Sequence, residues 1–532
     1  MRTGFVITVH TIKERRKVAA VLGWMTGIVT ISALYGYRSA YPTLPDRLRL
    51  SASFSHDAGI AAVFGPARSL ETVAGFTAFR TLAILPLIIG IWAGLTATKA
   101  LRGNEDSGQW EILVSSPITK RHATLATIRG IYLTLNITLV VSAILLTATS
   151  IISKNYSIPA GLFYALTLVA SGYLFAGVGS LASQLVNNRR SASTITGLVI
   201  GLSFLIRAVA DSSPSIAWMH WLSPLGWINQ AAPLTHSRWL GLLPVLATTI
   251  ILTAGAIALS GKRDMGASLI PEKISQRGGR AITSIPKLWI KLQGLNILSW
   301  AAGFFFLSFA FGLVAHGATK AFSSSSAIQT TVGALGISKM SELFFGIIFL
   351  MLASGLMFAA NSQAAALREQ ESEGYIDHLL VSPKSRNQVF LTRIATSTVG
   401  IVVIATAAGL GAYSGSSLRS GSLSLKDALL AGLNMVPSAL VLFGVSLVVF
   451  GFFPRATSVT GQSLLAWSFL MELIGSSLKL SHWILDTSFL HHMAFAPAAN
   501  PRLGENIQLL LIAMVLAGIG LFGFNRRDTA VG

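Results

Sequence analysis

The sequence contains no cysteine and has little charge, and its acidic residues are half as numerous as its basic ones. Of 532 residues, 11% are Asp, Glu, Lys or Arg, with 40 basic against 20 acidic side chains, whereas soluble domains carry about 25% charged residues. The lack of cysteine excludes a disulfide framework, a thiolate metal site and a cysteine nucleophile. With 52% hydrophobic residues and a mean hydropathy of +0.65, the composition indicates a membrane protein.

The sequence also lacks the motifs of an enzyme that hydrolyses ATP. A phosphate-binding loop needs the pattern G-x-x-x-x-G-K-[ST]. The only Gly-Lys pair, Gly261-Lys262, is followed by Arg263, and Ala256 occupies the position of the upstream glycine. No LSGGQ-like signature, HExxH pattern, paired-carboxylate motif or Ser-His-Asp arrangement is evident. We therefore expect no catalytic residue, no metal and no cofactor in this chain.

Long apolar runs divide the chain into two similar halves. A helix needs about 20 mostly apolar residues to span a membrane, and such runs lie near 18–36, 81–100, 129–152, 158–186, 194–211, 240–260, 295–315, 343–366, 391–413, 427–452, 459–479 and 507–525. We predict an all-α polytopic membrane protein with twelve transmembrane helices in two pseudo-two-fold related six-helix halves. The halves are 1–260 and 294–532, joined by a cytoplasmic linker, 261–293, with an interfacial helix after Pro286.

The loops give an orientation. Most Lys and Arg residues fall at the two termini, in the linker and in alternate loops, and such loops stay on the cytoplasmic side. Both termini are therefore predicted to be cytoplasmic, in a bacterial inner membrane. The basic N-terminal stretch, 1–17, is expected to lie along the inner surface before the first span. Residues 37–80 are expected to form an external loop.

One polar loop occurs twice. Residues 101–117, LRGNEDSGQWEILVSSP, align without a gap with residues 367–383, LREQESEGYIDHLLVSP, at an offset of 266, half the chain length. The identical pairs are Leu101/Leu367, Arg102/Arg368, Glu105/Glu371, Gly108/Gly374, Leu113/Leu379, Ser116/Ser382 and Pro117/Pro383. A repeat in the polar part of a membrane protein is not a product of composition. It is either a duplicated loop kept for folding or a pair of docking elements for a two-fold symmetric cytoplasmic partner.

The loop has a predictable local structure. Acidic residues alternate with apolar ones, which favours a short helix with one face toward the protein core; the residues are Glu105, Asp106, Trp110, Glu111, Ile112 and Leu113. Ser116-Pro117 combines a favoured helix N-cap with proline at the first helical position. Ser382-Pro383 repeats this pair, so each is predicted to begin the helix that continues into the next span.

The pattern LRxxExxGxxxxLxxSP after the second span resembles that of type-2 ATP-binding-cassette permeases. More narrowly, it resembles actinobacterial exporters with two fused six-helix halves, associated with polyketide antibiotics and multidrug efflux; the stretches YPT, FGPARSL and LSPLGW are similar as well. The resemblance implies that each repeated loop is a coupling helix. It assigns ATPase coupling to Glu105, Gly108, Glu111, Ser116, Pro117, Glu371, Gly374, Asp377, Ser382 and Pro383. The second copy departs at His378, where the first has Ile112.

The resemblance further implies a permease subunit that exports antibiotics or other drugs, with two copies of a separate ATPase subunit binding ATP and Mg²⁺. The low charge within the spans and the run Phe304-Phe305-Phe306 favour an apolar or amphipathic substrate. A proton-coupled secondary transporter of twelve-helix type is the alternative, and a membrane-embedded enzyme or assembly factor is a third possibility.

Two charged residues fall inside predicted spans. Arg207 and Glu472 each follow a cytoplasmic arginine, Arg190 and Arg455, by 17 residues. At about 1.5 Å per residue, both lie near the outer end of the bilayer. Because isolated charges there are costly, we predict an ion pair between Arg207 and Glu472 that closes the outer end of the pathway. The competing interpretation pairs Arg207 with Asp211, one turn away.

Overall fold

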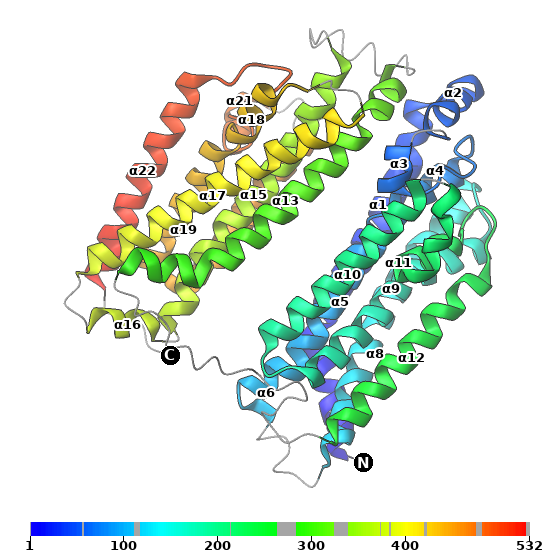
Figure 1. Ribbon diagram of the computed structural model, residues 1–532, viewed down its shortest axis with the longest axis horizontal. Coiled ribbons are helices and arrows are strands. Elements are labelled where there is room, and N and C mark those ends of the chain that lie inside the picture. The colour runs from blue at the N-terminus through cyan, green and yellow to red at the C-terminus, as the bar shows by residue number, and fades with distance from the viewer. Residues whose placement is uncertain are drawn as a thin grey trace. The chain divides into compact units, whose positions relative to one another are not determined.

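The computed structural model divides into two compact helical units, Met1–Arg277 and Gly278–Gly532 (Figure 1). The structure describes residues 2–55, 58–110, 118–212, 214–262, 284–323, 339–372, 374–381, 385–419, 423–474 and 481–527. None of these residues is in a β-strand, so the all-α prediction is confirmed.

The first unit consists of long helices with shorter ones between them. In chain order the helices are α1 (Arg2–Ala40), α2 (Leu44–Ser55), α3 (Ala58–Phe64), α4 (Val73–Leu82), α5 (Leu85–Thr98), a π-helical turn (Lys99–Gly103), α6 (Asn104–Asp106), α8 (Lys120–Ser153), α9 (Ile158–Leu185), α10 (Arg189–Ser212), a 3-10 helix (Pro214–Leu222), α11 (Pro224–Gln230), a 3-10 turn (Trp239–Leu242) and α12 (Leu243–Ser260).

The second unit has the same alternation of long and short helices. Its helices are α13 (Ile285–Ser323), α15 (Met340–Ser372), α16 (Tyr375–Leu380), α17 (Arg386–Ser417), α18 (Leu425–Leu433), α19 (Val436–Phe452), a 3-10 turn (Pro454–Ala456), α20 (Thr457–Ile474), α21 (His482–Leu485) and α22 (Leu503–Arg526).

Eleven helical segments of the described chain are long and apolar enough to cross a membrane. Each coincides with one of the predicted spans, so the polytopic character is confirmed. The remaining predicted span, 459–479, corresponds to α20, which is 18 residues long and contains Gln462 and Glu472. Its polar residues keep α20 out of the group of eleven, and the count of twelve stays a prediction.

Two expectations for the first 80 residues were wrong in detail. The basic N-terminal stretch and the first span are one continuous helix, α1. This continuity arises because the segment 1–40 contains no proline to interrupt the backbone hydrogen bonds. The predicted external loop is largely helical: α2 and α3 lie within it, and α4 begins at Val73, where Thr72 caps the helix by accepting a hydrogen bond from Gly75 N.

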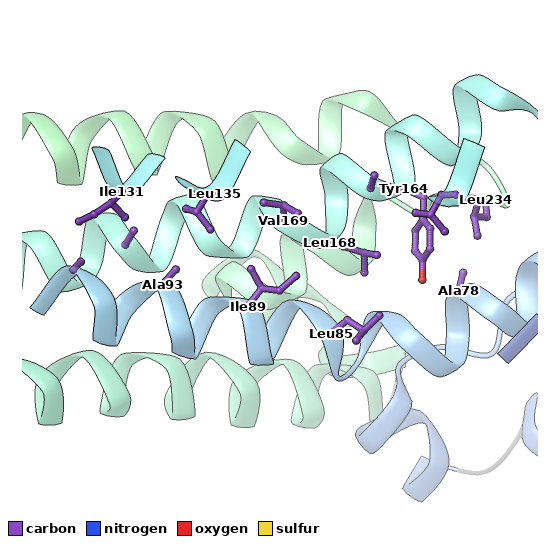
Figure 2. Packing of buried hydrophobic residues seen from close by; sticks show 14 of the residues in the cluster. Ala78, Leu85, Ile89, Ala93, Ile131, Leu135, Tyr164, Leu168, Val169 and Leu234 are labelled. Atoms are coloured by element: carbon purple, nitrogen blue, oxygen red, sulfur yellow. The ribbon is translucent and has the colours of Figure 1, made fainter. Parts of the chain in front are cut away.

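The core of the first unit lies between α5, α8 and α9. Figure 2 shows Ile89 and Ala93 of α5 packed against Leu135 of α8 and Leu168 and Val169 of α9. These five side chains are fully or almost fully buried. Alanines and glycines on the facing helices permit this close approach, as is typical where helices pack in a membrane.

In the second unit, α13 and α17 pack with almost no side chain between them. A Cβ atom added to Gly411 or Gly415 would lie 2.2 or 2.1 Å from the backbone oxygens of Phe305 and Phe309, respectively. Because higher-numbered residues of α13 meet higher-numbered residues of α17, the two helices are parallel. Their first turns therefore lie at the same end of the unit.

The repeated loop of the first unit lies at the end where α1 begins. Thr8 of α1 donates a hydrogen bond to the carbonyl oxygen of Ala126, in the second turn of α8. At the same end, Gly261 after α12 is in contact with the Arg121 side chain. The basic N-terminus, the repeated loop and the start of the linker thus lie together, as expected from the charge distribution.

Candidate site for coupling to a partner

The two copies of the repeated loop share one backbone turn. Gly108 and Gly374 both have left-handed φ angles, +74° and +76°. Their N–H groups donate to the carbonyl oxygens of Glu105 and Glu371 at 3.1 and 3.0 Å. A Cβ on either glycine would meet no atom within 4 Å. Glycine is therefore required by the backbone conformation, which a side chain disfavours, and not by lack of space.

The helices that follow the loops are also capped in the same way, but not where we predicted. The Thr119 side chain accepts a hydrogen bond from His122 N at the start of α8, and the Ser385 side chain accepts one from Gln388 N at the start of α17. Both caps have the extended backbone that an N-cap requires. We predicted Ser116 and Ser382 as these caps, and each observed cap is three residues further along the chain.

Part of each predicted coupling sequence lies outside the described residues. This is the case for Glu111, Ser116 and Pro117 in the first copy and for Ser382 and Pro383 in the second. Trp110 and its counterpart Ile376 are both buried, and the Trp110 indole N–H donates to Ala100 O at 3.4 Å. The predicted inward-facing apolar side of the loop is therefore confirmed at these two positions.

In the first unit a buried arginine fixes the loop. Arg102 is almost fully buried, and its Nε donates to the carbonyl oxygen of Asn187, between α9 and α10, at 2.9 Å. The same guanidinium forms ion pairs with Glu105 at 3.3 Å and with Asp106 at 3.2 Å. Asp106 in turn accepts a hydrogen bond from Arg189 N, at the start of α10, at 2.7 Å. Glu105 thus belongs to an internal network and presents little of its surface.

In the second unit the equivalent glutamate is held by a different arginine. Glu371 is fully buried, and its two carboxylate oxygens accept from Arg527 at 2.5 and 2.8 Å. Arg527 Nε also donates to Gly451 O at 3.1 Å, and the guanidinium lies 4.9 Å from the ring centre of Phe450. Arg386 donates to Arg527 O at 2.8 Å. This network, which we call the C-terminal clamp, joins the ends of α15, α19 and α22 to the start of α17.

Sequence reasoning missed the clamp because its partners are 156 residues apart. The family resemblance assigns Glu105 and Glu371 to ATPase coupling, but the side chains of both are turned inward. The exposed face of the second loop belongs to α16 and the residue after it: Tyr375 is 56% exposed, His378 is exposed and Val381 is 88% exposed. Spaced three residues apart, these side chains lie on one face of the helix. Asp377 is partly exposed beside them.

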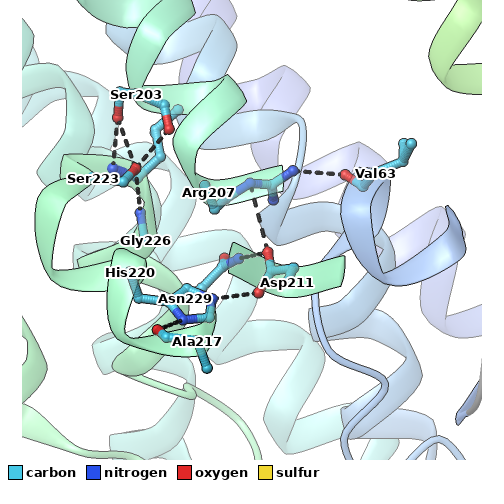
Figure 3. Close-up of polar contacts among 10 residues, drawn as sticks. Val63, Ser203, Arg207, Asp211, Ala217, His220, Ser223, Gly226 and Asn229 are labelled. Carbon is cyan, nitrogen blue, oxygen red and sulfur yellow. Dashed lines mark hydrogen bonds and ion pairs between the residues drawn. The ribbon is translucent and has the colours of Figure 1, made fainter. Parts of the chain in front are cut away.

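The second predicted site lies around Arg207, at the far end of α10 (Figure 3). Arg207 is almost fully buried, donates to Val63 O at 2.8 Å and lies 3.8 Å from the Asp211 carboxylate. His220 Nε2 lies 2.6 Å from Asp211, and its Nδ1 lies 2.6 Å from Ala217 O. In its charged form the imidazolium donates to both acceptors. The hydrogen bond to Asp211 favours this charged form and therefore raises the pKa of His220.

Asp211, the competing partner named from the sequence, thus contacts Arg207 in the structure. Glu472 belongs to α20 in the second unit, where it is partly buried. An ion pair between Arg207 and Glu472 stays a prediction.

A helical chain with eleven candidate membrane spans in its described residues is a polytopic membrane protein, and its two matching loops lie between such spans. Residues 284–525 match the family described as "Multidrug efflux system permease Rv1217c, C-terminal domain". The whole chain is a distant homologue of the multidrug efflux system permease protein Rv1217c of Mycobacterium tuberculosis (strain ATCC 25618 / H37Rv). The two are 27% identical over 541 aligned residues, which cover 99% of this chain and 96% of the relative.

Proposed function

We propose that this chain is the permease subunit of an ATP-driven exporter of apolar or amphipathic compounds in a bacterial cytoplasmic membrane. In this proposal, twelve spans form two pseudo-two-fold related halves with both termini in the cytoplasm. Two copies of a separate ATPase subunit, which bind ATP and Mg²⁺, dock on the loops near 101–116 and 367–382. The full-length similarity to an efflux permease supports a role in drug or antibiotic export.

The observation that carries the proposal is the matched pair of loops. Each has a left-handed glycine three residues after a glutamate that is ion-paired with an arginine, Arg102 in the first loop and Arg527 in the second. A loop that transmits a movement of its partner must be held firmly against the helices that it moves, since a loosely held loop would shift without moving them. Glu105 and Glu371 supply this attachment, and Gly108 and Gly374 supply the turn. Asp377 and, by their position in the repeat, Glu111 and the two Ser-Pro pairs remain proposed docking residues.

The exposed face of α16 is the surface on which we place the docking of an ATPase subunit. Tyr375 and Val381 together place exposed apolar surface on this polar loop, and aromatic residues are enriched in protein interfaces. Ile376 is buried beneath this surface, which fixes the orientation of this face relative to the second unit.

The test is purification of the chain together with the ATPase subunit, followed by measurement of drug-stimulated ATP hydrolysis. The variant Tyr375→Ala/Val381→Asp should weaken association about tenfold or more, since aromatic anchors carry much of an interface's energy. Leu418→Asp is the matched control: Leu418 is 68% exposed, between Tyr375 and Val381 in exposure, but it follows the opposite end of α17. Equal association of both variants with the ATPase would refute the docking surface.

The alternative function is proton-coupled secondary transport. The buried group of Arg207, Asp211 and His220 is the observation that favours it, because intramembrane and near-membrane titratable residues are typical of proton pathways. If the purified chain transports its substrate when only a proton gradient is applied, without ATP and without a second subunit, secondary transport is the function and ATP-driven export is refuted.

A further inference from the structure

A buried arginine in the second unit has no acidic partner among the residues that the structure describes. Arg393, in the second turn of α17, is 1% exposed. Its guanidinium donates to Ser397 Oγ at 2.9 Å and to Gln363 O on α15 at 3.1 Å, and lies 5.4 Å from the ring centre of Trp289 on α13. No carboxylate of the described chain lies within ion-pair distance of Arg393. A buried charge with only neutral partners is costly.

The residues around Arg393 have further polar atoms without a partner. Five buried atoms lack a hydrogen-bond partner within the described protein: Arg393 Nε, Trp289 Nε1, Gln363 Nε2 and both amide atoms of Gln293. All four side chains are more than nine-tenths buried. Gln293 follows Trp289 by one helical turn and so shares its face of α13. Helices α13, α15 and α17 lie side by side (Figure 1), and together they contribute four unpaired N–H donors against one acceptor.

The depth of this cluster corresponds to lipid headgroups. The 32 residues of α17 make a helix about 48 Å long, which exceeds a hydrocarbon core of about 30 Å. Arg393 is seven residues from the start of α17, or about 10 Å along its axis. It therefore lies near the boundary between headgroups and acyl chains. On the outer side of α13, Lys287 and Lys291 are exposed at the same level.

We propose that Trp289, Gln293, Gln363 and Arg393 form a binding site for a phosphate group, supplied either by inorganic phosphate or by the headgroup of a phospholipid. Phosphate oxygens accept hydrogen bonds from several N–H donors at once and neutralise the guanidinium. Lys287 and Lys291 attract the anion to this level of the unit. The phosphate group can enter the site only if the first turns of α13 move outward. Ile290 and Leu292, on another face of these turns, are exposed, so little of the described unit packs against that face.

The experiment uses the purified, delipidated full-length chain in a phosphate-free buffer. Thermal unfolding is followed while inorganic phosphate is added in one arm, phosphatidylglycerol in a second and diacylglycerol with the same acyl chains in a third. Ionic strength is held constant with chloride in all arms. We expect a rise in the unfolding temperature that saturates with phosphate or phosphatidylglycerol, because a ligand that binds only the folded state stabilises it. The arm that saturates identifies the source, and diacylglycerol should have no effect.

Three variants separate binding from folding. Trp289→Phe keeps an aromatic ring but removes the indole N–H, and should weaken binding about tenfold to 100-fold, the value of one hydrogen bond to a charged group. Arg393→Gln should abolish the ligand-dependent shift. Arg129→Gln, an exposed arginine at the comparable level of α8, should leave it unchanged. No saturable shift in either arm, or equal shifts in the wild type and in both Trp289→Phe and Arg393→Gln, would overturn the proposal.

Discussion

The C-terminal clamp should determine how firmly the second loop is attached. Glu371→Gln removes the negative charge from an ion pair whose carboxylate is fully buried, and leaves the Arg527 guanidinium without its counter-ion. Breaking such a pair costs roughly 3–5 kcal/mol. Arg527 is 16% exposed and keeps its bond to Gly451 O, so we expect the lower end, about 3 kcal/mol, which corresponds to a roughly 100-fold change in an opening equilibrium.

Hydrogen exchange measures this opening directly. Amides of residues 375–381 should exchange roughly 100-fold faster in Glu371→Gln than in the wild type, and drug-stimulated ATP hydrolysis should fall with it. Glu369→Gln is the matched control, because Glu369 is exposed two residues away on α15. In the first unit, Glu105→Gln should speed exchange of its own loop only about fivefold. There Arg102 lies 3.3 Å from Glu105 and keeps its ion pair with Asp106 after the substitution.

A double variant tests the physical reason. Glu371→Met combined with Arg527→Leu removes both charges and leaves neither buried alone, so slow exchange should be largely restored. Equal exchange in Glu371→Gln and Glu369→Gln would show that the clamp does not hold the loop. If Glu371→Gln opens the loop without changing ATP hydrolysis, the clamp stands and its part in coupling is refuted.

Three further predictions concern His220, Gly374 and the predicted pair of Arg207 and Glu472. Since the pKa of His220 is raised in the folded chain, protonation stabilises the first unit below about pH 6.5, and this stability is lost as pH rises through the folded pKa; thermal unfolding from pH 6 to pH 9 should show the loss, and Asp211→Asn should remove it. Gly374→Ala should accelerate exchange of the second loop at a cost of about 1 kcal/mol, because its φ is +76°; unchanged exchange contradicts this. Arg207→Glu and Glu472→Arg should each impair transport and the double exchange should restore part of it, whereas normal transport in either single variant excludes the ion pair.

The sequence by itself determined the helical, membrane-spanning architecture and the equivalence of the two loops. Hydrophobic length is a local property, since each span satisfies its own backbone hydrogen bonds, so eleven of the predicted spans could be located without knowledge of packing. The left-handed turns at Gly108 and Gly374 could also be found from the repeat, because backbone conformation at a glycine is local.

Only the tertiary structure decided which charges meet. Arg527 reaches Glu371 because the ends of α15 and α22 are brought together by helix packing, and no local pattern records that approach. The same holds for the four side chains around Arg393, which come from three helices. Burial of a charge depends on every helix around it, and its cost in a low-dielectric interior depends on which partner those helices supply. Residue types at fixed spacing can therefore predict a loop and its turn, but not the arginine that holds it.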